Sequence, residues 1–365
     1  MKFGIIKEQN EPRVSMTPVV IKKYVEHGHH FFVEKEAGKA SYFPDEQFEE
    51  AGARITDLSE IEKEAEILIS FKPLPAEGLR KFKKGTLFIS LFAPYSDQQA
   101  INDLTSAGHS AISMDMIPRT TLAQAMDVLS SMASLAGYRA VLEAATFLPK
   151  YFPMLTTAAG SIPPTKVLVL GAGVAGLQAI ATARRLGAVV EASDTRLAAK
   201  EEVESLGGKF LMVEGAKDDS SAGGYAVEQT EDFKQRQRDL VRDRAVKSDV
   251  IITTAQLRGK PAPVLVTSDM VAEMKPGSVI IDLASSTGGN CELTKDEEVI
   301  VEHGVTIVGS SNLAAKVPNN ASQLFSKNVA NLLDLIIREE GLEYNMDNEI
   351  IKSSLVVKEG EKLYQ

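Results

Sequence analysis

One stretch of the sequence, residues 166–196, constrains the fold more than any other. It reads KVLVLGAGVAGLQAIATARRLGAVVEASDTR. A short apolar run breaks into a glycine-rich turn where an alanine-rich helical pattern begins, and a second apolar run follows and ends at Asp194. This order predicts a strand, a tight turn, a helix and a second strand, the unit from which parallel sheets are built.

The glycines of this turn have separate mechanical roles. Gly171 permits the tight turn, Gly173 lets a pyrophosphate approach the backbone, and Gly176 lets the helix pack closely on the strand. The unpaired N–H groups and the positive dipole at the helix N-terminus favour an anion. Asp194 could accept both ribose hydroxyls of an adenosine and would repel a 2′-phosphate. The turn predicts a dinucleotide site that prefers NAD to NADP, although Arg196 favours the opposite preference; an ordinary βαβ unit with an incidental aspartate is the alternative.

Charge and cysteine content exclude several classes of protein. The 365 residues carry 50 acidic and 40 basic side chains, a net charge of -10, which disfavours binding to nucleic acid or to an anionic membrane. Cys291 is the single cysteine, so an internal disulfide or a multi-cysteine metal site is excluded. The N-terminus lacks the apolar core of a secretory signal, and no run approaches the roughly 20 apolar residues of a membrane helix. We expect a soluble, cytoplasmic chain of two or three domains without a membrane span of its own.

Short apolar runs also alternate with helical segments in residues 1–115. The candidate strands are Phe3 to Ile6, Phe31 to Val33, Ile67 to Phe71, Leu87 to Phe92 and Ala111 to Ser113. This alternation predicts a second parallel sheet, but one without a glycine-rich phosphate loop. Thr17 and Pro18 predict the start of a helix that runs to Glu26. The cluster of His27, His29 and His30 is better explained as a surface turn than as a metal site, because no cysteine or acidic ligand set accompanies it.

A long helical pattern follows in residues 118–148. Its apolar stripe consists of Leu122, Met126, Leu129, Ala133, Ala136 and Ala140. Such spacing predicts one helix that crosses between the domains. Gln124, Asp127 and Ser131 would share another face of that helix, lining a cleft or simply facing solvent. A second amphipathic segment, Ser322 to Arg338, could return the chain to the first domain, and the tail KSSLVVKEG predicts a small strand or hairpin.

The C-terminal half contains further buried strands and several polar loops. The predicted strands are Lys209 to Val213, Val250 to Thr254, Ser278 to Leu283 and Thr306 to Val308. Ligands of doubly wound sheets lie beyond the carboxyl ends of the strands, so the loops after Thr254 and Ala284 are expected to frame a cofactor. A long polar loop after Val213 carries Tyr225, which could close over a nucleotide or merely be exposed.

The chain is therefore predicted to be an α/β protein with two Rossmann-like, doubly wound parallel-sheet domains joined by long crossing helices. The N-terminal domain would comprise residues 1–125 and be completed by residues 325–365. The second domain would comprise residues 126–324, including the interdomain helix.

These residues resemble the NAD(H)-binding component of the proton-translocating nicotinamide nucleotide transhydrogenases and, more distantly, alanine dehydrogenases. The resemblance covers essentially the whole chain and is most specific in PRTTLAQAMDVLSSMASLAGYRAV, GAGVAGLQAIATARRLGAVVEASDTR, AGGYA and TTAQLRGKPAPVLVTSDMVAEMKPGSVIIDLASSTGGNCELT. It implies a polar set around the nicotinamide formed by Arg119, Gln124, Asp127 and Ser130, with Gln124 reaching the facing NADP(H). The NAD(H)-binding residues it implies are Gly171, Gly173, Val174, Ala175, Gly176, Asp194, Thr195, Arg196, Gly224, Tyr225, Thr254, Ala255, Gln256 and Leu257.

The same resemblance implies partners. Members of the family form a homodimer of this component against an NADP(H)-binding beta subunit, which is attached to a membrane domain that moves protons. The chain would then be cytoplasmic, of the split-subunit type, and held at the inner membrane through its partners. Two departures lie near the expected nicotinamide pocket: Ser285 and Ser286 stand where the family usually has an acidic residue, and no proline follows closely after Asn312.

The sequence also bears on the type of reaction. Oxidation of an amine or alcohol by NAD needs a positioned base, whereas exchange of a hydride between two nicotinamides needs none. Alanine dehydrogenases are expected to use a histidine after the strand that corresponds to residues 87–91, and this chain has histidines only at positions 27, 29, 30, 109 and 303. Two alternatives remain: an alanine-type dehydrogenase in which Arg13 and Lys72 bind a carboxylate, and a non-catalytic NAD-sensing module.

Overall fold

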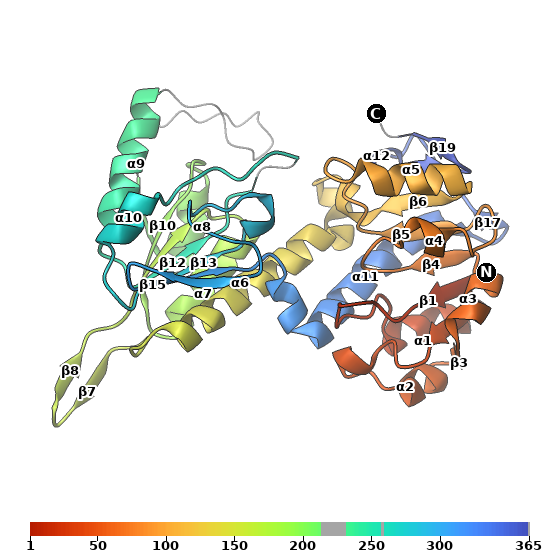
Figure 1. The fold of residues 1–365 in the computed structure, drawn as a ribbon. Coiled ribbons are helices and arrows are strands. Elements are labelled where there is room, and N and C mark those ends of the chain that lie inside the picture. Colours follow the sequence, from red (N-terminus) through yellow and green to blue (C-terminus); the bar gives the residue numbers. More distant parts are fainter. Residues whose placement is uncertain (213–230, 257–258, 364–365) are drawn as a thin grey trace. The chain divides into compact units, whose positions relative to one another are not determined.

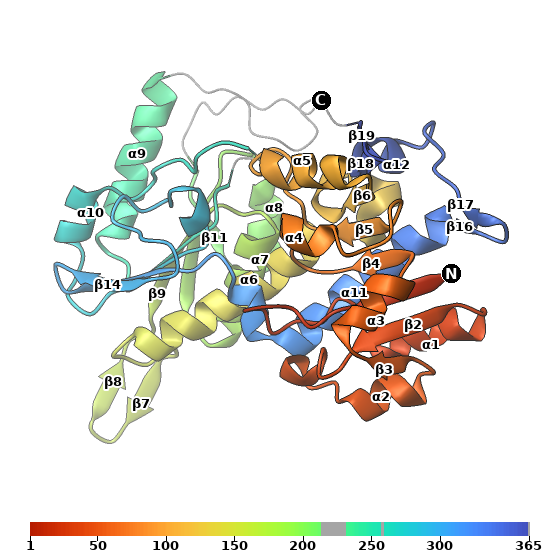
Figure 2. The ribbon, with the colours of Figure 1, turned by 45° about the vertical axis from the view of Figure 1, so that its right-hand side comes forward.

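The computed structural model describes residues 1–212, 231–256 and 259–363, and the chain divides into two compact units. The first unit comprises Met1–Met132 and Ala315–Gln365, and the second comprises Ala133–Ala314. In each unit helices flank a twisted sheet (Figure 1, Figure 2).

In the described part of the first unit, eight strands form a sheet in the order β3-β2-β1-β4-β5-β6-β18-β19. Strands β3 to β6 of this order are parallel, and β18 and β19 add an antiparallel edge. The strands are β1 (Lys2–Ile5), β2 (His30–Glu34), β3 (Arg54–Thr56), β4 (Ile67–Ile69), β5 (Leu87–Ser90), β6 (Ser110–Ser113), β18 (Leu355–Lys358) and β19 (Glu361–Lys362). The α-helices are α1 (Pro18–Glu26), α2 (Asp45–Glu50), α3 (Leu58–Glu64), α4 (Ala76–Leu79), α5 (Gln98–Ala107), α11 (Pro318–Ile336) and α12 (Glu349–Ser354). Short 3-10 helices are η1 (Lys39–Ser41), η2 (Met114–Met116) and η3 (Thr121–Met126), and β16 (Ile337–Arg338) pairs with β17 (Gly341–Leu342).

The described residues of the second unit form a seven-stranded sheet in the order β11-β10-β9-β12-β13-β15-β14. All neighbours are parallel except β14, which pairs with β15 in the antiparallel sense. The strands are β9 (Lys166–Leu170), β10 (Val189–Ser193), β11 (Lys209–Phe210), β12 (Val250–Thr253), β13 (Val279–Asp282), β14 (Val299–Glu302) and β15 (Val305–Gly309). The helices are α6 (Val128–Phe147), α7 (Val174–Arg185), α8 (Ala199–Ser205), α9 (Glu231–Ala245), α10 (Ser268–Glu273), η5 (Ser285–Thr287) and η6 (Leu313–Lys316). An exposed hairpin of β7 (Leu155–Thr157) and β8 (Gly160–Ile162) extends from this unit (Figure 1).

Each sheet is buried on both faces, which explains the uninterrupted apolar runs that predict its strands. In β9, Val167 and Val169 belong to a core shared with α6 and α7, whereas Leu168 and Leu170 belong to a core shared with α9 and α10. Because neighbouring side chains of a strand point to opposite faces, a strand covered on both sides has no polar positions to alternate with. The predicted α/β class with Rossmann-like parallel sheets is confirmed.

Two edge strands, β3 and β14, were not predicted from the sequence. The strand β3 is a three-residue segment with an exposed arginine, and β14 exposes both of its valines. Edge strands pack on one neighbour only and therefore lack the buried apolar signature on which the sequence analysis depends.

The prediction of a single long helix over residues 118–148 is wrong for the N-terminal part of that segment. The chain forms η3 first, leaves helical geometry at Asp127 with φ -73 and ψ 88, and only then begins α6. The Asp127 carboxylate accepts hydrogen bonds from the Ser130 backbone N–H at 2.9 Å and the Ser130 hydroxyl at 2.6 Å, so it caps α6 instead of continuing a helix through it. Leu122, expected to be buried, is 86% exposed, whereas Ala140 is fully buried as expected.

The helix α6 crosses the division between the two units along the chain, whereas α11 lies wholly within the first unit. The predicted C-terminal hairpin is present as β18 and β19. Among the described residues, every helix is too short or too polar to cross a bilayer.

Candidate functional site

The switch point of the second sheet lies between β9 and β12, where the strand order reverses direction. The loops that follow these two strands touch: the Thr254 N–H donates to the Leu170 carbonyl at 2.9 Å, and its hydroxyl donates to the Gly171 carbonyl at 3.1 Å. Crevices of doubly wound sheets form at such points, outside the carboxyl ends of the strands.

The glycine-rich turn has the geometry that its sequence predicts. Gly171 has φ +100, and a Cβ there would lie 2.5 Å from the Thr254 hydroxyl. A Cβ on Gly176 would overlap the Gly171 carbonyl oxygen, so this position permits the close packing of α7 on the turn. A Cβ on Gly173 would meet nothing within 4 Å, and the helix begins there without a side-chain cap. Open space in front of an uncapped helix N-terminus fits the phosphates of a dinucleotide. Val174 and Ala175 form the first turn of this helix.

Asp194 follows β10 and is held beside the same turn. Its carboxylate accepts the Ala172 N–H at 2.7 Å and the Arg196 N–H at 2.8 Å. The Arg196 guanidinium donates to both carboxylate oxygens, through Nε at 3.0 Å and Nη2 at 3.1 Å. This hydrogen bonding to Asp194 raises the pKa of Arg196 above its already high usual value. The structure therefore brings Asp194, Arg196 and the turn together, with Thr195 between the two charged residues.

A hollow of about 480 Å³ opens beyond Asp194, next to the start of α8. Its lining residues are Leu197, Ala198, Lys200, Glu201 and Met212. Leu197 and Met212 are partly exposed there, so the hollow presents apolar surface close to the carboxyl end of β10.

A buried polar network that the sequence analysis missed supports the loop after β12. Asp282, fully buried at the end of β13, accepts hydrogen bonds from the N–H groups of Asn290 at 2.7 Å and Cys291 at 3.0 Å, and from the Thr294 hydroxyl at 2.8 Å. The Asn290 side chain then pairs with both the N–H and the carbonyl of Ala255, each at 2.9 Å. Through Asn290, the network fixes the backbone of Ala255, a predicted cofactor-binding residue that lies 35 residues away along the chain. The sequence did contain a signal for this network: Asp282 ends an apolar strand, and a glycine pair, Gly288 and Gly289, follows it.

The remaining predicted residues of this unit lie in different surroundings. Gln256 is exposed and its amide donates to the Leu283 carbonyl at 2.9 Å. Ser285 is buried and donates to Asp296 at 2.6 Å. Gly224, Tyr225 and Leu257 lie outside the described residues.

In the first unit, the predicted polar set lies just before η3, on η3, and at the junction of η3 with the first turn of α6. Asp127 and Ser130 are hydrogen-bonded to each other, while Arg119 and Gln124 are exposed on the segment before them. That segment is anchored by the buried side chains of Ala123 and Met126, and its Ala125 carbonyl accepts the Asn328 amide of α11 at 2.8 Å. Gln124 therefore does not share one helix face with Asp127 and Ser131, because η3 and α6 are separate helices. Ser131 does lie one turn after Asp127, and its N–H donates to the Asp127 carbonyl at 3.2 Å.

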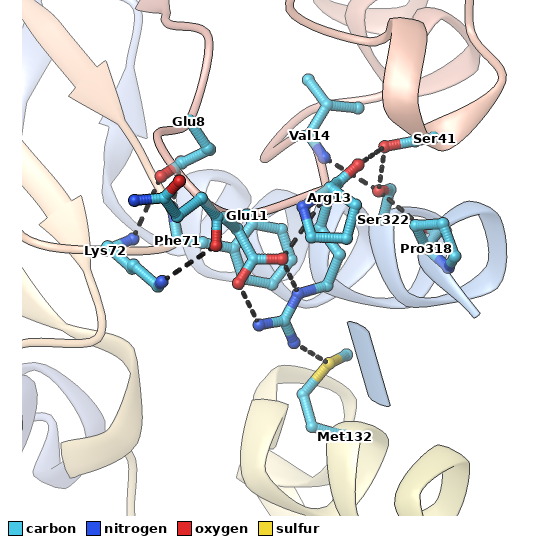
Figure 3. Close-up of polar contacts among 12 residues, drawn as sticks. Glu8, Glu11, Arg13, Val14, Ser41, Phe71, Lys72, Met132, Pro318 and Ser322 are labelled. Atoms are coloured by element: carbon cyan, nitrogen blue, oxygen red, sulfur yellow. Dashed lines mark hydrogen bonds and ion pairs between the residues drawn. The ribbon is translucent and has the colours of Figure 1, made fainter. Parts of the chain in front are cut away.

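The corresponding switch point of the first sheet, between β1 and β4, is occupied by the chain's own charged side chains (Figure 3). Glu11 pairs with Arg13 through two hydrogen bonds of 2.6 and 2.7 Å, and both residues are buried. The Lys72 ammonium donates to the Asn10 carbonyl at 3.3 Å. Glu8 accepts the Phe71 N–H at 2.6 Å, and burial raises the pKa of its carboxyl to about 7.

The histidine cluster is engaged in local contacts. A ring nitrogen of His27 lies 2.6 Å from the Lys23 carbonyl, and one of His29 lies 3.3 Å from the N-terminal amine. Over the described stretches of the chain, no group of three or more His, Cys, Asp or Glu side chains is placed to hold a metal ion.

A parallel sheet with a glycine-rich turn at its switch point and an acidic residue after the next strand defines a Rossmann-like nucleotide-binding protein. Comparison with known proteins identifies its family. The model of the alanine dehydrogenase/PNT N-terminal domain matches residues 4–136, and that of the C-terminal domain matches residues 140–365. The chain belongs to the alanine dehydrogenase/PNT family.

Individual relatives separate two branches of this family. The chain is 43% identical over 372 residues to the first portion of the NAD(P) transhydrogenase alpha subunit of Rhodospirillum rubrum, covering 99% of this chain and 97% of the relative. A crystal structure of transhydrogenase from Sinorhizobium meliloti matches with a TM-score of 0.91 at 41% identity, covering 99% and 100% of the two chains. Alanine dehydrogenase of Staphylococcus epidermidis is 30% identical over 360 residues, covering 91% of this chain and 88% of the relative. The chain is thus more similar to these transhydrogenases than to this dehydrogenase.

Proposed function

We propose that this chain is the NAD(H)-binding component of a proton-translocating transhydrogenase. In this role it holds NAD(H) while a hydride passes between its nicotinamide and that of NADP(H) on a partner subunit. The observation that carries the proposal is the switch point of the second sheet, where an open, uncapped glycine turn adjoins Asp194, in a chain 43% identical to a transhydrogenase alpha subunit.

The parts of the switch point suit the parts of the nucleotide. The N-terminus of α7 offers backbone N–H groups and a positive dipole end to the pyrophosphate, with Gly173 leaving room for it. Asp194 suits the adenosine ribose, and the hollow bordered by Leu197 and Met212 suits the adenine ring. Thr254, Ala255 and Gln256 would line the other side of the crevice.

Hydride transfer between two nicotinamides needs orientation and exclusion of water but no proton transfer by the protein. Arg119, Gln124, Asp127 and Ser130 are assigned to this task as hydrogen-bonding anchors for amide and ribose groups. No histidine lies in the loop directly after β5, and the next one along the chain, His109, is buried with a ring nitrogen 2.9 Å from the Leu79 carbonyl. Burial lowers the pKa of His109, which disfavours its charged form.

The proposal includes partners. A homodimer of this chain would associate with an NADP(H)-binding beta subunit and, through it, with the membrane component that translocates protons. The chain would then be a cytoplasmic protein held peripherally at the inner membrane.

The test is hydride transfer from NADH to NADP⁺ with and without the NADP(H)-binding partner, and the NADPH formed is separated by anion-exchange chromatography through its 2′-phosphate. We expect transfer only when both proteins are present. L-alanine with NAD is the control, and NADH formed from it would favour an alanine-type dehydrogenase instead.

A variant separates the catalytic role from simple NAD sensing. Gln124→Asn shortens an exposed side chain, and we expect it to slow hydride transfer about tenfold while the Kd for NADH changes by less than about twofold, because it affects ring placement and not nucleotide capture. Unchanged transfer in Gln124→Asn, Arg119→Ala and Asp127→Asn would contradict the catalytic assignment and favour a non-catalytic NAD-sensing module.

A further inference from the structure

The carboxylate of Asp194 has no acceptor capacity left in this structure. A carboxylate offers about four lone-pair sites. Four N–H groups fill them: the backbone N–H groups of Ala172 and Arg196, and the Nε and Nη2 groups of the Arg196 side chain. Asp194 cannot accept two ribose hydroxyls until two of these four N–H groups leave.

The side chain of Arg196 is the partner that can leave. The two backbone donors are the N–H groups of Ala172, in the glycine turn, and of Arg196 itself, and the fold fixes both. The Arg196 side chain is 30% exposed, against 9% for Asp194, so it can turn toward solvent. It also donates to the Ala172 carbonyl at 3.1 Å, which ties it across the mouth of the turn.

The same ion pair alters the charge that a 2′-phosphate would meet. A bare Asp194 would repel the phosphate of NADP(H), which is the usual basis of NAD preference. Here a guanidinium forms two hydrogen bonds with that carboxylate and offsets its charge. Once displaced, Arg196 remains only two residues from Asp194 along the chain, so its charge can act on a phosphate bound there within the screening length of roughly 8 Å at physiological salt.

We infer that Arg196 is a specificity-determining residue: its guanidinium occupies the ribose-binding face of Asp194, so that NAD(H) must displace it, and its charge then lowers the discrimination against NADP(H). The inference rests on the proposed NAD(H)-binding function. It assigns Arg196 two separable effects, competition with the ribose and attraction of a 2′-phosphate.

Isothermal titration calorimetry with NADH and with NADPH on the full chain tests both effects. Arg196→Gln removes the competitor and the charge, so NADH should bind about fivefold more tightly and NADPH about fivefold more weakly, the size expected for a partly exposed ion pair. Arg196→Lys keeps the charge but not the two-pronged contact. It should tighten NADH binding less than Arg196→Gln does and hold the NADPH affinity within about twofold of the wild type.

Arg185→Gln is the matched control. Arg185 is exposed at the last turn of α7, about 16 Å along the helix from the glycine turn, and its replacement removes the same charge. Both affinities should stay within about twofold of the wild type.

The outcomes separate the inference from the function on which it rests. If the wild type binds no NADH, the proposed function fails. If it binds NADH but Arg196→Gln binds NADH no more tightly, or changes the affinities for NADH and NADPH by the same factor, Arg196 has only a structural role and the inference is overturned.

Discussion

The two sheets of this protein share one topology and differ at the point where that topology creates a binding crevice. Both place a first strand centrally, wind outward on one side and then resume on the other, as β3-β2-β1-β4-β5-β6 and β11-β10-β9-β12-β13-β15. In the second unit, residues 171–173 lead directly from β9 into α7. In the first, residues 6–17 separate β1 from α1 and carry Glu8, Glu11 and Arg13, which lie in one network of polar contacts (Figure 3).

The difference shows that the strand order alone does not make a nucleotide site. A short glycine turn leaves the N–H groups of the following helix without side-chain partners and the space before them open. The long loop of the first unit supplies partners for its own polar groups: Glu8 accepts a hydrogen bond from the Phe71 N–H, and Glu11 forms an ion pair with Arg13. In this protein, the short connection leaves its polar groups without side-chain partners, and the long connection supplies such partners itself.

The largest effect is expected from adding one methyl group to each unit. Gly176→Ala would force a Cβ into the Gly171 carbonyl oxygen, a backbone atom that cannot yield cheaply. Gly4→Ala would place one 2.5 Å from the Cγ2 of Ile61 and 3.0 Å from the Cβ of Ala65, so that α3 must shift away from β1. We expect Gly176→Ala to weaken NADH binding about 100-fold or more and to cost several kcal/mol of stability, and Gly4→Ala to cost about 1–3 kcal/mol while NADH affinity is kept. Calorimetric titration and thermal unfolding measure both; an equal loss of NADH affinity in Gly4→Ala would break the comparison.

Replacing a buried carboxylate by an amide should lower the stability of the second unit at Asp282 and raise that of the first unit at Glu8. The larger effect is expected at Asp282. Asp282 is fully buried and accepts from Asn290, Cys291 and Thr294, so the NH₂ of Asp282→Asn would face donors and leave at least one unpaired. We expect a loss of about 3 kcal/mol in the free energy of unfolding, measured by urea denaturation. The exposed Glu204→Gln should change it by less than about 0.5 kcal/mol. Near-equal values would show that Asp282 does not organise its loop.

The amide replacement of Glu8 should give the smaller effect, with a pH dependence. The pKa of Glu8 is raised from 4.5 to about 7, mainly by burial, so the folded state prefers the protonated form. The resulting stability is fully present below pH 4.5 and is lost as the pH rises through about 7. Glu8→Gln cannot ionise and should gain about 2 kcal/mol on the wild type between pH 4 and pH 8, as the side chain keeps some contact with solvent.

Thermal unfolding across this pH range checks the Glu8 prediction, and Glu50→Gln, which alters an exposed carboxylate of α2, is the control. If the difference in stability between Glu8→Gln and the wild type stays constant with pH, the pKa of Glu8 is not raised by burial and this prediction is wrong.

Much of the fold and some of the site could be predicted from the sequence because the relevant signals are local. The strand β9, the turn and α7 follow from adjacent residues, and the positive φ of Gly171 follows from the tight turn that glycine permits. The helix over residues 118–148 could not be placed correctly, because a regular apolar spacing does not reveal that Asp127 binds Ser130 in preference to continuing the helix.

The sequence by itself thus determined the α/β class, the second parallel sheet and the position of a dinucleotide turn, all of which rest on side-chain periodicity and on the conformational freedom of glycine. The tertiary structure alone decided which polar groups are already satisfied. Arg196 covers the face of Asp194, and Asn290 holds Ala255 from 35 residues away. Hydrogen bonds of this kind depend on where the fold brings two atoms and on which rotamer each side chain adopts, and neither is encoded in the order of neighbouring residues.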